Sequence, residues 1–131
     1  MIIRKALILA GIVVTASAAP AFAHHSFAMF DMDKTVKMQG TVKDFQWTNP
    51  HSWLQVMVLG PNGEQQDWSL EMTAPATLAS HGWRPHSVSA GDKISFSIHP
   101  LKDGTRGGEL LEATLPDGKT LGLPAPGYKK D

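Results

Sequence analysis

The chain has 131 residues, enough for one domain, and its 12 basic and 12 acidic side chains give a formal net charge of zero. This balance excludes the basic excess with which nucleic-acid-binding proteins contact phosphate groups. The absence of cysteine excludes disulfide bonds, zinc–thiolate sites and a lipid-modified N-terminal cysteine, and the 42% hydrophobic content is that of a folded domain.

The first 23 residues have the pattern of a secretory signal peptide. A basic pair at positions 4 and 5 precedes an apolar run over residues 6–14, and Ala21-Phe22-Ala23 is a small-x-small cleavage site. The alternative is an uncleaved membrane anchor, but the run is shorter than the ~20 residues that span a bilayer. We expect a mature chain that begins at His24, has no membrane span and is periplasmic or secreted.

The next part of the chain predicts three strands, over residues 41–47, 52–59 and 66–72. A bulge near Lys43 and Asp44 would bring the apolar residues of the first strand onto one face. The turn Gly60-Pro61-Asn62-Gly63 closes the second and third strands into a hairpin. The residues expected to face inward are Val42, Phe45, Trp47, Leu54, Val56, Val58, Trp68, Leu70 and Met72.

A short helix follows, with Thr73 as a plausible N-cap, Pro75 in its first turn and Gly82 as its stop. Two further strands are predicted over 93–99 and 109–115, and a brief return over 119–121. Strict alternation puts Glu109 and Glu112 on opposite faces of the fifth strand. The residues expected to face inward here are Ile94, Phe96, Ile98, Leu111, Ala113 and Leu115, and those expected to face outward include Ser95, Ser97 and His99.

This order of elements predicts an all-β fold with one short helix. Short alternating strands with Gly and Pro turns favour a barrel or a sandwich, and a helix between the third and fourth strands is the order of the five-stranded OB-type barrel. We predict a single OB-like domain over residues 24–123 with a flexible tail over 124–131. A small β-sandwich is the alternative.

Several motifs resemble those of a family of small exported bacterial proteins of uncharacterised function. They are His24-His25-Ser26-Phe27 after the signal peptide, Gly40-x-Val42-x-x-Phe45-x-Trp47-x-Asn49-Pro50-His51-Ser52-Trp53, Trp68-Ser69-Leu70-Glu71, Gly82-Trp83-Arg84-Pro85 and Gly91-Asp92. The match covers most of the mature chain. The resemblance implies export and a single domain, and it implies no catalytic residue.

The mature N-terminus is a candidate metal site. Cleavage after Ala23 gives His24 a free α-amine beside an imidazole, and these two nitrogens form a chelate ring. A second imidazole would complete the nitrogen-rich, planar arrangement that Cu(II) prefers. His25 is adjacent, and His51 and His99 are the other candidate donors; we favour His51, which lies at a corner among aromatic residues. Glu71 could add an oxygen ligand or orient a ligand. The alternative is that these histidines have structural or solvent-facing roles.

The second candidate is a metal-free surface for an envelope protein or a small ligand. Trp53 lies opposite the apolar face of its strand, near His51 at a corner marked by Pro50. Trp47, Glu71 and His99 are expected to contribute to this surface. The alternative for Trp53 is burial beneath the N-terminal segment. No nucleophile elbow, phosphate loop or paired-carboxylate motif occurs, so we expect no enzymatic activity.

Overall fold

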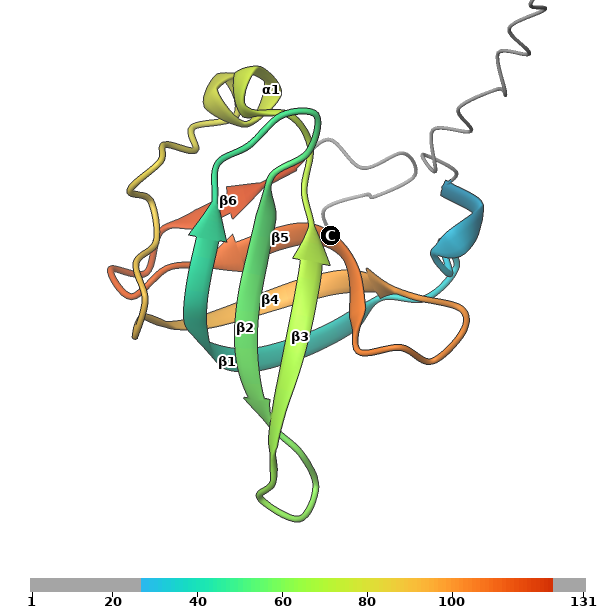
Figure 1. The fold of residues 1–131 in the computed structure, drawn as a ribbon. Helices are drawn as coiled ribbons and strands as arrows, with labels where there is room; N and C mark the ends of the chain where they lie inside the picture. The colour runs from blue at the N-terminus through green and yellow to red at the C-terminus, as the bar shows by residue number, and fades with distance from the viewer. Residues whose placement is uncertain (1–26, 124–131) are drawn as a thin grey trace, which may run out of the picture.

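The computed structural model describes residues 27–123, which form a closed five-stranded mixed barrel with one extra strand (Figure 1). The sheet order is β3-β2-β1-β4-β5-β6, and a parallel pairing of β3 with β5 closes the barrel. The predicted OB-like barrel is confirmed, and the alternative sandwich is not formed. The elements are η1 (Phe27–Met29), β1 (Val36–Gln46), β2 (Trp53–Leu59), β3 (Gln65–Glu71), α1 (Pro75–Ser80), β4 (Lys93–Pro100), β5 (Gly107–Thr114) and β6 (Thr120–Gly122).

The long strand β1 pairs with two different strands along its length. Its first half, from Val36 to Thr41, pairs with β4, and its second half, from Thr41 to Gln46, pairs with β2. The β1–β2 register shifts between Val42 and Asp44, which confirms the predicted bulge. Such a bulge bends a strand and increases its twist. The bend lets a single strand leave one neighbour and join the other.

The barrel interior holds the alternating apolar residues that the sequence predicts. Leu54, Val56 and Leu70 are 0% exposed, while Trp68 is half-buried against them. The Trp83 side chain is also fully buried, and its Nε1 donates to the Gly122 carbonyl oxygen at 3.1 Å. Burying large apolar side chains in this way is the main stabilising contribution to such a fold.

The helix α1 covers one end of the barrel (Figure 1) and inserts Leu78 into the core. It begins at Pro75 and is followed by Gly82, whose φ of +91° suits glycine, as predicted. The predicted cap at Thr73 is wrong, because the residue before the helix is Ala74 and no side chain caps it. The Thr73 carbonyl instead accepts from the Ser52 amide at 3.1 Å, which extends the β2–β3 pairing.

The strand β5 departs from the predicted alternation. Its register with β4 shifts, so that Glu112 pairs with Ser97 but Leu110 pairs with Ile98, and Leu111 is the extra residue. Leu110, which alternation places on the outer face, therefore joins the core cluster, and Leu111 is also fully buried. The bulge also puts Glu109 and Glu112 on the same, outer side of the sheet, which corrects the prediction of opposite faces.

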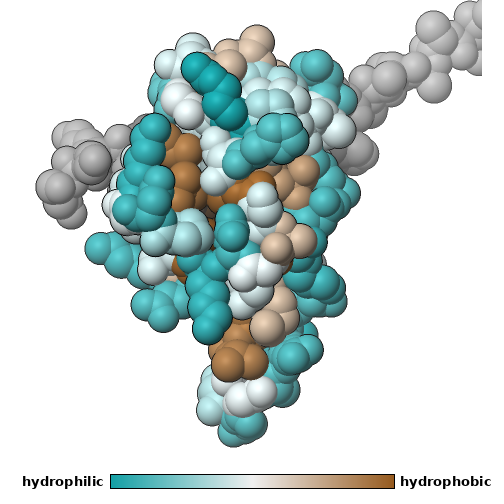
Figure 2. Space-filling model, turned by 90° about the vertical axis from the view of Figure 1, so that its left-hand side faces the viewer, coloured by the Kyte–Doolittle hydropathy of each residue, from teal (hydrophilic) through white to brown (hydrophobic). Residues whose placement is uncertain are grey.

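Figure 2 shows a mostly hydrophilic surface with hydrophobic residues gathered in a hollow and in a spot above the β2–β3 hairpin. Within residues 27–123, no helix combines the length and the apolar character needed to cross a membrane. The predicted signal peptide (1–23), the histidines at positions 24 and 25, and the tail (124–131) lie outside the described residues.

Candidate functional site

Four polar side chains form a row on the outside of the barrel, where β3 and β5 close it. His99 at the end of β4 pairs with Glu109 at the start of β5, and Glu109 pairs with Glu71 at the end of β3. Paired residues project from the same side of a sheet. His51, in the β1–β2 connection, adds the fourth side chain through a 3.1 Å contact of its Nδ1 with Glu71 Oε1. We call these four residues the outer polar row.

The His51 ring is held by two acceptors at one nitrogen. Its Nδ1 lies 3.0 Å from the Met72 carbonyl oxygen and 3.1 Å from Glu71 Oε1. A proton on Nδ1 satisfies both oxygens, and the lone pair of the ring is then on Nε2. The side chain is 29% exposed, so the ring is oriented by the barrel but accessible at the surface. Metal-binding histidines are commonly oriented in this way.

The connection that carries His51 is itself tied to the barrel. The Thr48 hydroxyl donates to the His51 carbonyl oxygen at 2.8 Å, and the Ser52 side chain is fully buried at the start of β2. The Asn49–Pro50 peptide bond is cis, which fits the predicted corner. His51 therefore sits on a short, hydrogen-bonded turn.

His99 is buried, contrary to its predicted place on the partner surface. It points away from the barrel interior but is only 3% exposed. The segment before β1 lies over it: Phe30 bridges to Leu101, and the Lys34 carbonyl oxygen accepts from His99 Nδ1 at 2.8 Å. The second ring nitrogen, Nε2, is buried and has no hydrogen-bond partner within the described residues.

Glu109 is the second unsatisfied member of the outer polar row. Partial burial raises the pKa of its carboxyl group, the neighbouring Glu71 carboxylate adds to the rise, and the attraction of His99 opposes it. Its Oε2 atom is buried and, in the described part of the chain, has no hydrogen-bond partner. Buried polar atoms of this kind are usually satisfied by water, an ion or a ligand.

The tryptophans divide between surface and core. Trp53 pairs with Glu71 and lies half-buried on the outer face beside the row, as the sequence predicts. Trp47, expected on both the inward face and the partner surface, is half-buried and packs against the core. Its ring contacts Phe45 edge-to-face, with ring centroids 5.8 Å apart. Phe45 also contacts the Trp83 ring at a tilted angle, so these aromatic contacts link Trp47 to the core.

Glu109 is the site residue that sequence reasoning missed. Its strand was identified, but its place beside His99 and Glu71 depends on barrel closure. Among residues 27–123, no three His, Cys, Asp or Glu side chains are placed so that they could hold one metal ion.

Comparison with known proteins identifies the chain at family level. A family model described as a family of unknown function (DUF6152) matches residues 11–110, which is most of the chain. Neither the curated proteins nor the solved structures gave a match. The comparisons therefore give no activity or ligand for this chain, and functional inference depends on its own residues.

Proposed function

This chain belongs to the DUF6152 family, and we propose that it is an exported, periplasmic β-barrel protein that binds copper through His24 at its mature N-terminus. The role is binding rather than catalysis. His24 supplies its α-amine and a ring nitrogen, and His51 supplies a further imidazole, with His25 as an additional donor. Cu(II) favours such nitrogen-rich, tetragonal sets of ligands.

The orientation of His51 is the observation that carries this proposal. Its Nδ1 faces the Met72 carbonyl oxygen and Glu71, so the lone pair is at Nε2 in the neutral ring. Glu71, at the end of β3, is 16% exposed and contacts the His51 ring. A carboxylate behind a histidine makes that histidine a better metal ligand. Glu71 is thus assigned a positioning role.

The N-terminus can reach His51 from where the described chain begins. Phe30 bridges to Leu101 beside the outer polar row, and the Lys102 amide donates to the Met29 carbonyl oxygen at 3.0 Å. Because Phe27–Met29 form the 3-10 helix η1, the short chain from Phe30 back to His24 can span at most roughly 16 Å. Two strand spacings, about 10 Å, separate β4 from β3. This reach supports a site shared by His24 and His51.

Copper titration of protein purified from the cell envelope tests the proposal, with N-terminal sequencing to establish cleavage after Ala23. Electron paramagnetic resonance of the Cu(II) complex reports the bound nitrogens. We expect His24→Ala, or an extra glycine before His24, to remove tight binding. We expect His51→Ala to lose one nitrogen ligand, whereas His81→Ala, which changes an exposed histidine next to α1, leaves the spectrum unchanged.

Identical binding by all variants, or no binding by any of them, would overturn the proposal. The second result would favour the metal-free alternative, in which His51 and the half-buried Trp53 contact an envelope protein or a small ligand. Trp53→Ala is then the variant of interest, because Trp53 pairs with Glu71 on the outer face and is not part of the core cluster.

A further inference from the structure

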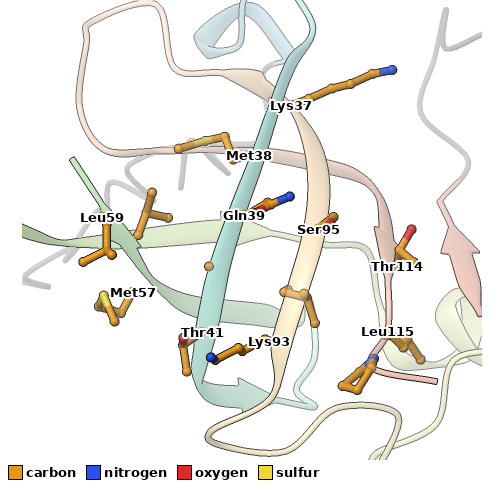
Figure 3. A pocket seen from close by; sticks show the side chains of 14 residues that line it. Lys37, Met38, Gln39, Thr41, Met57, Leu59, Lys93, Ser95, Thr114 and Leu115 are labelled. Carbon is orange, nitrogen blue, oxygen red and sulfur yellow. The ribbon is translucent and has the colours of Figure 1, made fainter. Parts of the chain in front are cut away.

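The barrel has an open seam between β1 and β2. Pairing of these strands begins at Thr41 with Met57, and the pairs that would continue it, Gly40 with Val58 and Gln39 with Leu59, are not formed. From there β1 continues alongside β4 alone. A groove of about 780 Å³ reaches this seam (Figure 3); it runs from Met57 and Leu59 of β2 across Gln39 and Thr41 of β1 to Lys93 of β4 and Thr114 of β5.

The backbone of β1 offers unpaired hydrogen-bonding groups to this seam. Val42 bonds toward the β4 side, since its amide donates to Asp92 and its carbonyl oxygen accepts from Gly91, both at 2.8 Å. In an antiparallel ladder the bonding direction alternates along a strand. The amide and carbonyl groups of Lys37 and Gln39 therefore point away from β4, toward a side on which no strand of residues 27–123 pairs with them. An open edge of this kind is a template for another strand.

The side chains around the seam are apolar on one side and basic on the other. Leu59 is 63% exposed, and Met38 and Met57 lie with it on the hairpin side of β1 (Figure 3). Lys37 and Lys93 are exposed and also line the groove. In the part of the chain that the structure describes, neither lysine forms an ion pair with a carboxylate.

We propose that this seam binds an extended, acidic segment of a partner protein, which adds to β1 as a further strand. The side chains of an added strand would alternate. One set would face Met38, which packs at the edge of the core, and the other would face the outer surface near Lys37 and Lys93. Apolar side chains suit the positions that face Met38, and aspartate or glutamate suits the positions near the two lysines. Strand addition of this type takes its affinity from main-chain bonds and its specificity from alternate side chains.

Charge argues against a second copy of this chain as the occupant. Two β1 edges paired about a two-fold axis would bring the lysines of both copies into one interface. Like charges on neighbouring strands destabilise such a pairing. An acidic partner instead neutralises both lysines. This inference is independent of copper binding, because the seam involves none of the proposed copper ligands.

Nuclear magnetic resonance with two synthetic peptides tests the proposal. One heptapeptide alternates glutamate with valine, and its control alternates lysine with valine. We expect the acidic peptide alone to bind the ¹⁵N-labelled protein, to shift the amide signals of Lys37, Gln39 and Leu59, and to slow the hydrogen exchange of the first two. Shifts confined to other parts of the barrel, equal binding of both peptides, or binding of neither would refute the proposal.

Substitutions in the seam separate the main-chain contribution to peptide binding from the side-chain contribution. Gln39→Pro removes an amide that points into the groove and makes no barrel bond, so it should weaken peptide binding about fivefold, the effect of one hydrogen bond. Gln39→Ala keeps the amide and should bind like the wild type. Leu59→Ser should weaken binding without changing thermal stability, because Leu59 is 63% exposed. Concentration-dependent dimerisation with shifts at these same amides would assign the seam to a second copy and overturn an acidic partner.

Discussion

Replacement of Glu109 by glutamine should stabilise the protein at neutral pH. The Glu109 carboxyl group is partly buried beside the Glu71 carboxylate, and its Oε2 has no hydrogen-bond partner in the described residues. Burial and the neighbouring charge both raise its pKa. The ionised form is therefore less favourable in the folded state than in the unfolded state. Glutamine has nearly the same shape but no charge.

The sign of the pH dependence follows from this raised pKa. Below the ordinary value of 4.5, Glu109 is protonated in both the folded and unfolded states, and its contribution to stability is fully present. As the pH rises through the folded-state pKa, the folded protein must release a proton that it binds more tightly than the unfolded chain does. Stability is then lost. The Glu109→Gln variant does not lose stability in this way. The difference in unfolding free energy between this variant and wild type should therefore be small near pH 4 and largest at neutral pH and above.

The expected gain at neutral pH is about 1 kcal/mol, the upper end of the range for an exposed pair of charges, because glutamine removes the partly buried charge and its repulsion from Glu71. For a domain of this size, 1 kcal/mol changes the melting temperature by roughly 4–8 °C. Thermal unfolding of Glu109→Gln and wild type between about pH 4 and pH 8 measures the difference. Glu112→Gln, the same change on the same face of β5, is the control. An equal effect of both variants, or a destabilised Glu109→Gln, would refute the reasoning.

Three further substitutions test the fold. Gly108→Ala should destabilise the protein by about 1–3 kcal/mol in chemical unfolding, because its Cβ would lie 2.5 Å from the His99 carbonyl oxygen; an unchanged midpoint would contradict the tight β4–β5 packing. Trp83→Phe removes the bond to Gly122 and leaves a cavity in the core, so it should cost about 2–4 kcal/mol by the same measurement. Thr73→Ala should change the melting temperature little, because Thr73 does not cap α1, whereas loss of a true cap costs about 1 kcal/mol.

The features that sequence predicts well are those encoded by neighbouring residues. The turn over residues 60–63 contains the glycines and proline that its geometry needs, and Gly63 has a φ of +77°. The bulge between Val42 and Asp44 follows from a break in the apolar alternation of one strand. The five-stranded barrel follows from the order of the elements.

The features that sequence misses depend on distant partners. Leu111 follows the apolar alternation of its strand and is buried, but the β4–β5 register shift also brings Leu110, which alternation places outside, into the core cluster. His99 has the pattern of an outward residue, and it is buried because the segment from Phe30 to Lys34 crosses over it. Neither the register shift nor the crossing segment has a local sequence signal. Both result from pairing between residues that are far apart in the chain.

The outer polar row illustrates the same limit for the candidate site. Glu71 and Glu109 become neighbours only through the parallel β3–β5 pairing that closes the barrel, so the sequence identifies His51 and Glu71 but not Glu109 as site residues. The bend in β1 that accompanies closure has a second consequence, because β1 leaves β2 and opens the seam beside Gln39. The two regions lie on different sides of β4: the seam is beyond β1, whose Lys37 and Gln39 pair with β4, and the row runs from His99 of β4 to Glu109 of β5 and Glu71 of β3. Closure of the barrel thus brings the row together and leaves the first half of β1 without β2 as a neighbour.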